Sequence, residues 1–241
     1  MRQLGQHQVE IEENLAAWQR KPLLQDIYNG FYRRILALID PAGSGHVVEL
    51  GSGIGNLKQH FPKAITSDLF PNPWLDLVCD AYHLPFRDAS VSHLILFDVF
   101  HHLRYPAAFF KEARRVLNGR LILFEPFISW TSLPVYGLLH HEAIGWREAI
   151  DPAETPRETS YYAAQGNATR MFFRSKVKGW RVIHAEAFSA FHYVLSGGFS
   201  KPALYPRAFL KPLQGVDALL TRWPRLFAAR CLVALSPEGG C

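Results

Sequence analysis

The chain has 241 residues, of which 49% are hydrophobic and 20% charged, a balance typical of a folded globular protein and not of a disordered one. Its three cysteines are too few for a disulfide framework, and Cys79 and Cys231 lie in apolar runs, so we expect buried thiols in a reducing, cytoplasmic compartment. The N-terminus lacks the apolar core of a signal peptide. The longest apolar run, residues 121–139, contains Glu125, Pro126 and Pro134, so no transmembrane segment is predicted.

The formal net charge of +5 is unevenly distributed along the chain. Residues 170–230 contain eleven Lys and Arg residues but only two acidic residues, Glu186 and Asp217. Such a basic segment favours anionic substrates, peripheral contact with an acidic membrane surface, or nucleic acid. An ordinary solvated face has the same composition and is an equally good interpretation.

Residues 9–39 are predicted to be helical, because apolar side chains recur there at three- and four-residue spacing. The recurring residues are Leu23, Leu24, Ile27, Tyr28, Phe31, Ile35, Leu36 and Ile39. A turn over residues 41–45, which contains Pro, Gly and Ser, ends the helix. This leading helix is compatible with two positions, packed on the sheet that follows or lying over a ligand cleft.

The central part of the chain alternates between predicted strands and helices. A strand over residues 46–50 is followed by glycines at positions 51, 53 and 55, and residues 56–59 can begin a helix. Further strands are predicted over residues 64–68, 76–80 and 92–98, then a helix over 106–117 and a strand over 120–125. This alternation predicts a parallel sheet with helices on both faces. Acidic residues end each of the last four strands, and open α/β sheets bind ligands at that edge.

The second half of the chain is less regular. We expect an apolar helix over residues 131–141, a polar insertion or lid over 151–167, a strand-like run over 180–194, a helix over 206–223 and a last strand over 228–235. The segment between Glu125 and Tyr193 is rich in aromatic residues. These side chains would line an apolar acceptor pocket, although a hydrophobic core has the same composition and is the safer interpretation.

Three acidic residues beside the glycine loop indicate the kind of ligand. Asp68 ends the second strand, where a carboxylate can accept hydrogen bonds from both hydroxyls of a ribose. Asp80 ends the third strand, within reach of an adenine amino group, but it could instead cap the following turn. Glu49 is placed to receive a positively charged amino group. A dinucleotide fingerprint would need glycine at Asn56, and Glu49 would repel phosphates.

Three motifs occur in a fixed order: residues 49–55 (ELGSGIG) with Asp68, residues 80–90 (DAYHLPFRDAS) and residues 97–103 (FDVFHHL). Together they resemble class I S-adenosylmethionine-dependent methyltransferases of the small-molecule type 11 group, over residues 47–125. The resemblance implies a Rossmann-like seven-stranded methyltransferase sheet with helices on both faces and a lid or insertion after strand five. We therefore expect an N-terminal helical lid over residues 1–45 and a cofactor-binding methyltransferase domain over 46–241, with an acceptor-side insertion over 127–178.

The resemblance also implies a cofactor, S-adenosyl-L-methionine, which leaves as S-adenosyl-L-homocysteine. Gly51 and Gly53 would pass close to its methionine part, whose amino group faces Glu49. Asp68 would hold the ribose, Asp80 and the backbone of Ala81 would read the adenine, Leu69 would pack on its ring, and Asp98 would border the carboxylate and the sulfonium.

A hydroxyl acceptor needs a base to remove its proton, and His101 and His102 follow strand four at the mouth of the predicted cleft. The unperturbed pKa of histidine, near about 6.5, suits either residue to that task. The plainer interpretation is that one of the pair packs inward and the other lies at the surface. His140, His141 and Glu142 also form a cluster, but adjacent residues on a helix point apart, so no metal site is predicted.

The function predicted from the sequence is methyl transfer to a small molecule, most simply at a hydroxyl oxygen of a sugar, a secondary metabolite or an anionic or lipid-linked acceptor. A catalytically silent protein that only binds the cofactor is the alternative. A nucleotide-dependent dehydrogenase is disfavoured by Glu49 and Asn56. No nucleic-acid partner is expected, because the residues after strand four, Asp98 to His101, lack the prolines that orient a flipped base.

Overall fold

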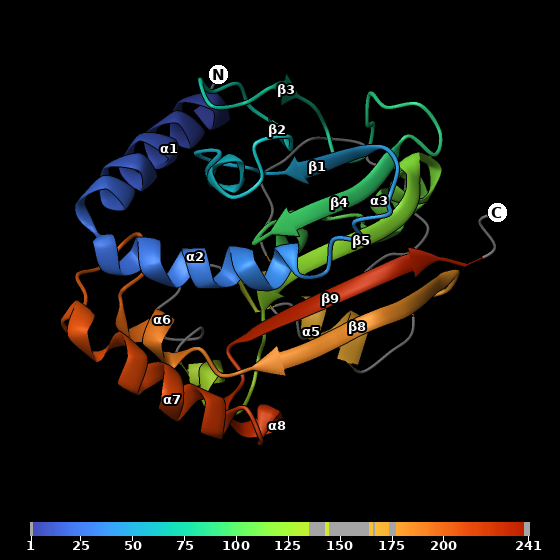
Figure 1. Cartoon of the computed structure of the whole chain (residues 1–241). Coiled ribbons are helices and arrows are strands. Elements are labelled where there is room, and N and C mark those ends of the chain that lie inside the picture. Colours follow the sequence, from blue (N-terminus) through green and yellow to red (C-terminus); the bar gives the residue numbers. More distant parts are fainter. Residues whose placement is uncertain (1, 135–142, 145–163, 166, 174–176, 239–241) are drawn as a thin grey trace.

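The computed structural model of the chain describes residues 2–134, 143–144, 164–165, 167–173 and 177–238. Its main sheet has seven strands in the order β3-β2-β1-β4-β5-β9-β8 (Figure 1). Strands β1 to β5 are parallel, whereas β9 runs antiparallel to both of its neighbours. The strands are β1 (His46–Leu50), β2 (Ile65–Asp68), β3 (Leu77–Val78), β4 (Val91–Phe97), β5 (Leu117–Pro126), β8 (Trp180–Phe188) and β9 (Arg230–Pro237). The predicted seven-stranded Rossmann-like sheet is confirmed.

Helices cover both faces of this sheet, as predicted. On one face α2 (Pro22–Leu36) packs its fully buried Ile27 and Ile35 against a cluster that includes Ile95 of β4 and Ile122 of β5. On the other face α3 (Pro106–Val116) and α5 (Asn167–Phe173) contribute Phe109 and Phe172 to a second cluster. Successive residues of a strand point to opposite faces, so the central strands supply both cores and are continuously apolar.

The N-terminal segment forms two helices, α1 (Arg2–Arg20) and α2, where the sequence predicted one. The break falls at Lys21, because Pro22 cannot donate a helical hydrogen bond and pushes the preceding residue out of the helical region. The Lys21 ammonium then donates hydrogen bonds to the carbonyls of Gly198 (2.7 Å) and Lys201 (2.6 Å). As a result α2 belongs to the core, while α1 extends away from it past the ends of β1 and β2 (Figure 1).

Several other predicted elements are shorter in the structure. Residues after the glycine loop form only a 3-10 turn, η1 (Asn56–Gln59), and a second turn, η2 (Phe100–His102), follows β4. The strand-like run predicted over residues 180–194 divides into β8 and the helix α6 (Phe191–Leu195). The helix predicted over 206–223 divides into η3 (Arg207–Phe209) and α7 (Leu210–Leu220), and α8 (Pro224–Phe227) follows. Short strands β6 (Ala143–Ile144) and β7 (Ala164–Gln165) pair with each other.

Most of the helix predicted over 131–141, and nearly all of the polar stretch over 151–167, lies outside the described residues. No helix in the described part of the chain has the length and apolar character needed to cross a membrane.

Candidate functional site

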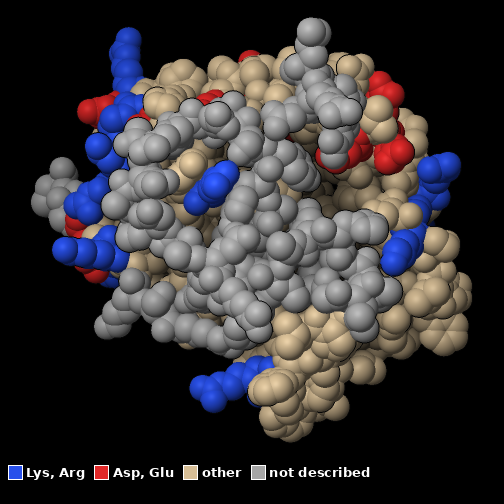
Figure 2. Space-filling model, turned by 180° about the vertical axis from the view of Figure 1, so that it is seen from behind, with Lys and Arg blue, Asp and Glu red and all other residues tan. Residues whose placement is uncertain are grey.

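A cavity of about 310 Å³ opens at the carboxyl ends of β1, β2 and β4. The predicted residues Gly51, Gly53, Asp68, Leu69, Asp80, Ala81, Asp98 and His102 all line it. The helix α1 supplies a further wall, made of His7, Glu10, Ile11 and Asn14. Figure 2 shows a hollow at the upper right with acidic side chains at its rim. The strand-end carboxylates thus meet at one edge of the sheet, as the order of elements predicted.

Two glycines of the loop after β1, Gly51 and Gly53, have a left-handed backbone conformation. Gly51 has φ +65°, and a Cβ atom there would collide with the side chain of Val99. Gly53 has φ +52°, and the nearest atom to a Cβ there would be Ile11 Cδ1 at 3.9 Å, so its outer side faces open space below α1. Glycine tolerates this left-handed backbone, whereas other residues are strained in it. The loop therefore packs tightly at Gly51 and leaves room for a ligand at Gly53.

Two serines, which the sequence analysis did not single out, hold this loop to β2. The amide of Ser52 donates to the carbonyl of Ser67 (2.9 Å), and the amide of Ser67 donates to Ser52 Oγ (3.1 Å). Both hydroxyls also donate to the carbonyl of Glu49, at 3.1 Å from Ser52 and 2.9 Å from Ser67. These buried bonds fix the loop relative to the strand that carries Asp68.

Glu49 is 2% exposed, and its Oε2 atom has no hydrogen-bond partner in the described structure. Burial raises the pKa of this carboxyl from 4.5 to about 8. Glu49 is not among the described residues that line the cavity, but it lies two positions before Gly51, which does. A buried carboxyl oxygen without a partner is costly to keep unless a ligand satisfies it, and a cationic group is the natural one.

Asp68 is held by the backbone beside it. Its Oδ2 accepts from the amide of Gly53 (3.2 Å), and its Oδ1 accepts from the amide of Leu69 (2.7 Å). On the far side His7 of α1 places Nε2 at 4.0 Å from Asp68 Oδ1, and that nitrogen is buried without a hydrogen-bond partner. Burial raises the pKa of Asp68, and His7 and the backbone amides oppose this rise. A carboxylate and an imidazole nitrogen therefore face the same narrow space.

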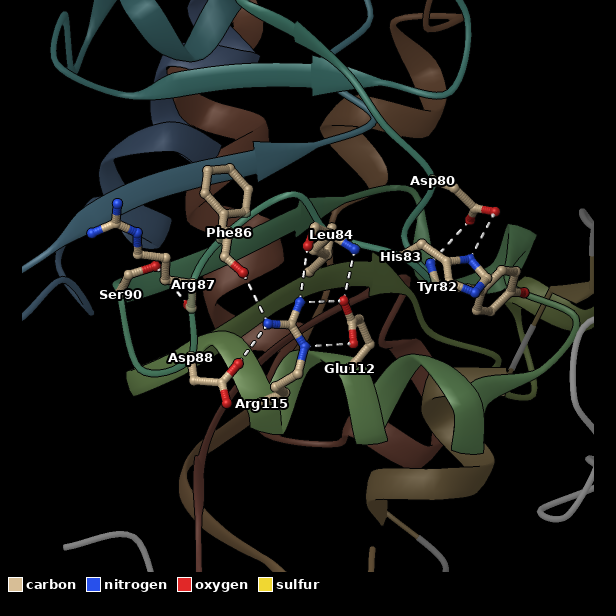
Figure 3. A network of polar contacts seen from close by, with 10 residues as sticks. All are labelled: Asp80, Tyr82, His83, Leu84, Phe86, Arg87, Asp88, Ser90, Glu112 and Arg115. Atoms are coloured by element: carbon tan, nitrogen blue, oxygen red, sulfur yellow. Dashed lines mark hydrogen bonds and ion pairs between the residues drawn. The ribbon is translucent and has the colours of Figure 1, made fainter.

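Asp80 caps the following turn, which is one of the two roles that the sequence left open. Its Oδ1 accepts from the amide of Tyr82 (2.9 Å) and so caps the turn, while its Oδ2 lies 3.7 Å from His83 Nδ1 (Figure 3). The residue nevertheless lines the cavity together with Ala81 and Tyr82. The turn thus orients the Asp80 side chain at the cavity wall.

The motif over residues 80–90 is attached to α3 by one arginine (Figure 3). Arg115 donates to the carbonyls of Leu84 and Phe86, both at 2.9 Å, and to Asp88 at 2.7 Å. It also makes a forked contact with Glu112, at 2.6 and 3.0 Å, and Glu112 accepts from the amide of Leu84 (2.7 Å). The Arg115 guanidinium lowers the pKa of Glu112. Asp88 is thus part of a structural clamp.

Asp98 follows β4 with φ +56° and forms an ion pair with Arg230 of β9, which is 3% exposed. The Arg230 guanidinium also lies over the Tyr193 ring, 4.5 Å from its centroid. Burial raises the pKa of Asp98, and Arg230 opposes this rise. Arg230 was not predicted from the sequence, although it is the single charged residue in the apolar run over 228–235.

The two candidate histidines lie in different surroundings. His101 is 4% exposed, its Nδ1 lies 2.7 Å from Glu125 Oε2, and it is not among the described residues that line the cavity. The Glu125 carboxylate also accepts from the amides of Val99 (2.9 Å) and Phe100 (2.6 Å), so it fixes the turn η2. His102, by contrast, is partly exposed and lines the cavity. Of the pair, only His102 faces the space where a reaction could occur.

No group of three or more His, Cys, Asp or Glu residues in the described chain is arranged to hold a metal ion. The cluster of His140, His141 and Glu142 lies outside the described residues. The described site thus consists of a glycine loop, strand-end carboxylates and two partly exposed histidines, His7 and His102.

Residues 48–123 match a protein family described as a methyltransferase domain, of the type 11 group. This part of the chain is similar to a methyltransferase domain, and the cofactor that such a domain implies is S-adenosylmethionine. The match covers most of the segment from β1 to β5 and includes the glycine loop and every carboxylate that lines the described cavity except that of Glu10. No curated protein matches the sequence.

Solved methyltransferase structures share this fold. One from Haloferax volcanii, in complex with a methyltransferase activator, superposes with a TM-score of 0.53 at 18% identity, covering 96% of this chain and 95% of its own. An S-adenosylmethionine-dependent methyltransferase from Thermotoga maritima gives 0.53 at 15% identity, covering 95% and 99%. Another from Archaeoglobus fulgidus gives 0.52 at 12% identity, covering 87% and 93%. At these identities the likeness establishes the fold of the chain and not its acceptor.

The residues of the methyltransferase site fit S-adenosylmethionine. The unpartnered buried carboxylate of Glu49 suits its amino group, the open side of Gly53 leaves room for its methionine part, and Asp68 with His7 suits a ribose diol. A cavity of about 310 Å³ is at the lower end of the range for ligand pockets.

Proposed function

We propose that this methyltransferase methylates a hydroxyl oxygen of a small molecule, with His102 as the general base. The observation that carries the proposal is the position of His102, which lines the same cavity as Gly51, Gly53 and Asp68. The cofactor supplies, when bound, an electrophilic methyl group together with its own leaving group. What remains for the protein is to align an acceptor oxygen and to take up its proton.

Each cofactor-binding role in this proposal belongs to a residue of the cavity or of its loop. Glu49 holds the amino group, Asp68 the ribose hydroxyls, and Asp80 with the Ala81 backbone and Leu69 the adenine. Asp98, fixed by Arg230, borders the carboxylate and the sulfonium, and Gly51 and Gly53 let the backbone approach. The backbone bonds to Asp68 and the turn bond to Asp80 support these roles, because they orient both carboxylates before a ligand arrives.

His101 receives a different role from His102. Its contact with the buried Glu125 carboxylate makes it a support of the turn η2, and this turn carries His102. On this reading His101 positions the base and does not itself touch the acceptor. A hydroxyl compound, whether a sugar, a secondary metabolite or a lipid-linked alcohol, matches a histidine base better than an amine acceptor, which can lose its proton after transfer.

The cofactor assignment is tested by calorimetric titration of the purified protein with S-adenosylhomocysteine, with NAD as the control ligand. We expect micromolar-class binding of S-adenosylhomocysteine, no binding of NAD, and a loss of at least about tenfold in affinity for Asp68→Asn. Asp76→Asn is the matched control, because Asp76 ends no strand at the cavity and instead pairs with Lys58 and Thr66. Binding that is indifferent to Asp68 would remove the proposal.

The acceptor is then sought by incubating the protein with S-adenosylmethionine and panels of alcohols and amines, with release of S-adenosylhomocysteine as the readout. Transfer to alcohols that is lost in His102→Gln supports the proposed chemistry. Cofactor binding without transfer to any member of either panel would favour the catalytically silent alternative.

A further inference from the structure

Exposed apolar side chains gather along η3, α7 and α8 in a regular stripe. Phe209, Pro212, Val216, Leu219, Trp223 and Leu226 follow one another at three- and four-residue spacing, and all are exposed. The exposed fractions of Phe209, Val216 and Trp223 are 57%, 52% and 51%. Pro212, Val216 and Leu219 lie on one side of α7, because residues spaced in this way share a helix face. Phe209 of η3, Trp223 just before α8 and Leu226 of α8 continue the same spacing along the chain. We call these six residues the outer stripe.

The outer stripe is not the side by which α7 joins the fold. That side buries Leu210, which belongs to the core cluster of α2, and Asp217, whose carboxylate accepts from Ser189 Oγ (2.5 Å) and from the amide of Phe191 (2.9 Å). The outer side of α7 is therefore apolar, and its inner side is partly apolar. A surface helix that exposes its apolar residues normally meets a partner or a lipid surface.

Trp130 extends this surface from a distant part of the sequence. Its backbone amide donates to the carbonyl of Arg225 (3.1 Å), and Thr131 bonds the carbonyl of Leu226 through its amide (3.1 Å) and its hydroxyl (2.6 Å). The indole of Trp130 is 74% exposed. Two tryptophans and a phenylalanine thus stand on one surface beside aliphatic residues, a composition typical of proteins that insert side chains into the headgroup region of a bilayer.

The exposed charged residues of the segment over 201–226, which carries the outer stripe, are all basic. Lys201, Lys211, Arg222 and Arg225 are exposed, and in the described structure none of their side chains is paired with a carboxylate. Arg207 is paired with Asp26 (Nη2 to Oδ1, 2.8 Å). Between Glu186 and Glu238 the sequence has one acidic residue, the buried Asp217. In Figure 2 the lower right of the molecule, where α7 lies in that view, is free of red.

We propose that this surface, made of the outer stripe, Trp130 and the four unpaired basic residues, docks on an anionic membrane. An anionic bilayer satisfies both halves of the surface at once, since its acyl boundary takes the apolar side chains and its phosphates attract the cations. A purely apolar contact between two copies of the chain would leave the four basic side chains without an anionic partner. An anionic bilayer is therefore the better match to this surface.

Docking in this way would turn the catalytic edge of the sheet toward the membrane. The segment α8 leads directly into Arg230, which begins β9 and pairs with Asp98 at the cavity. Phe188, at the end of β8, and Pro126, at the end of β5, are both in register with Arg230. The surface therefore adjoins the edge where the cavity opens, and Figure 1 shows α7 on the side to which the arrows of β1 and β4 point.

The test uses the full chain and vesicles of phosphatidylcholine, either alone or with about 30% phosphatidylglycerol, in a flotation assay without cofactor. We expect binding to the anionic vesicles only, and a decrease as salt rises from about 50 to about 300 mM. The double variant Leu219→Ser with Trp223→Ser, and the triple variant Lys211→Gln, Arg222→Gln and Arg225→Gln, should each weaken binding at least about tenfold.

Matched controls come from exposed residues at the other end of β8. Val182→Ser removes an apolar side chain that is 50% exposed, and Arg181→Gln removes an exposed cation, so both should bind vesicles like the parent protein. Unchanged melting temperature and unchanged S-adenosylhomocysteine affinity show that each variant is folded. Because vesicle binding is measured without cofactor, its failure is distinct from failure of the proposed function.

Two outcomes overturn the proposal. One is absence of binding to anionic vesicles, or binding that both sets of surface variants leave unchanged. The other is a concentration-dependent dimer in sedimentation that Leu219→Ser with Trp223→Ser dissociates, because the outer stripe would then be an interface between two copies of the chain.

Discussion

Glu49 makes the stability of the folded protein depend on pH, because its carboxyl is buried and its Oε2 atom has no hydrogen-bond partner in the described structure. Its carboxyl is fully buried, and folding raises its pKa from 4.5 to about 8. Between these two pH values the folded chain binds more protons at Glu49 than the unfolded chain does. The free energy of unfolding therefore falls as the pH rises from about 4.5 to about 8.

Glu49→Gln should consequently stabilise the protein without cofactor at high pH while weakening cofactor binding. The gain should be small near pH 5.5 and reach roughly 2–4 kcal/mol near pH 8.5, because the amide has no charge to bury. Urea unfolding of both proteins at the two pH values measures it, and calorimetry measures the affinity for S-adenosylhomocysteine. Equal stability of the two proteins at high pH would mean that Glu49 has a partner in solution.

The two histidines should separate chemistry from folding. His102→Gln should lower kcat by about 10²–10⁴-fold while leaving the affinity for S-adenosylhomocysteine within a few fold, since it removes only a base. His101→Gln should instead lower the free energy of unfolding by roughly 1–3 kcal/mol, because it disturbs a buried bond to Glu125. The pH profile of kcat/KM checks the distinction, as the limb assigned to the base should vanish only in His102→Gln.

At the level of elements, α1 and α2 should respond differently to the cofactor. Four side chains of α1 line the cavity, whereas α2 supplies seven buried residues, all of them in the core cluster. We expect S-adenosylhomocysteine to slow hydrogen exchange of the amides over residues 7–14 by at least about tenfold and to leave those of α2 nearly unchanged. Equal protection of both helices would indicate a single rigid unit, in place of the lid over residues 1–45 that the sequence predicted.

Arg115 should be the main support of the motif over residues 80–90. Arg115→Ala leaves the carbonyls of Leu84 and Phe86 and the carboxylate of Glu112 without this donor, which should lower the free energy of unfolding by roughly 1–3 kcal/mol. It should also weaken binding of adenosine-containing ligands, since Asp80 and Ala81 begin the same motif. Arg87→Ala, in an exposed position of that motif, is the control and should do neither.

The sequence predicted those parts of the site that neighbouring residues define. The glycine loop, the strand-end acids and the turn at Asp80 each follow from a short stretch of chain, and the structure has all of them. Arg230 and His7 were missed because their partners, Asp98 and Asp68, lie 132 and 61 positions away in the sequence. Only the folded sheet brings them together. The break at Lys21 was missed for another reason. The apolar periodicity over residues 9–39 predicted one continuous helix, and the helix-breaking effect of Pro22 was not taken into account.

In the whole molecule, the cavity joins segments that are far apart in the sequence, and this predicts how strongly the cofactor stabilises the fold. Its walls come from α1, the loop after β1, the ends of β2 and β4 and the motif at Asp80. A ligand that binds only when all these walls are in place stabilises the folded chain by about 2.7 kcal/mol at a concentration of 100 times Kd.

For a chain of this length, that stabilisation should raise the melting temperature by roughly 5–10 °C. Thermal unfolding with S-adenosylhomocysteine at this excess measures the shift, and NAD at the same concentration should produce none. A roughly tenfold weaker affinity of Asp68→Asn should reduce the shift to about half at the original ligand concentration, and a proportionally higher concentration should restore it. Equal shifts of both proteins at every ligand concentration would show that the stabilising ligand does not use Asp68, and that it does not bind in this cavity.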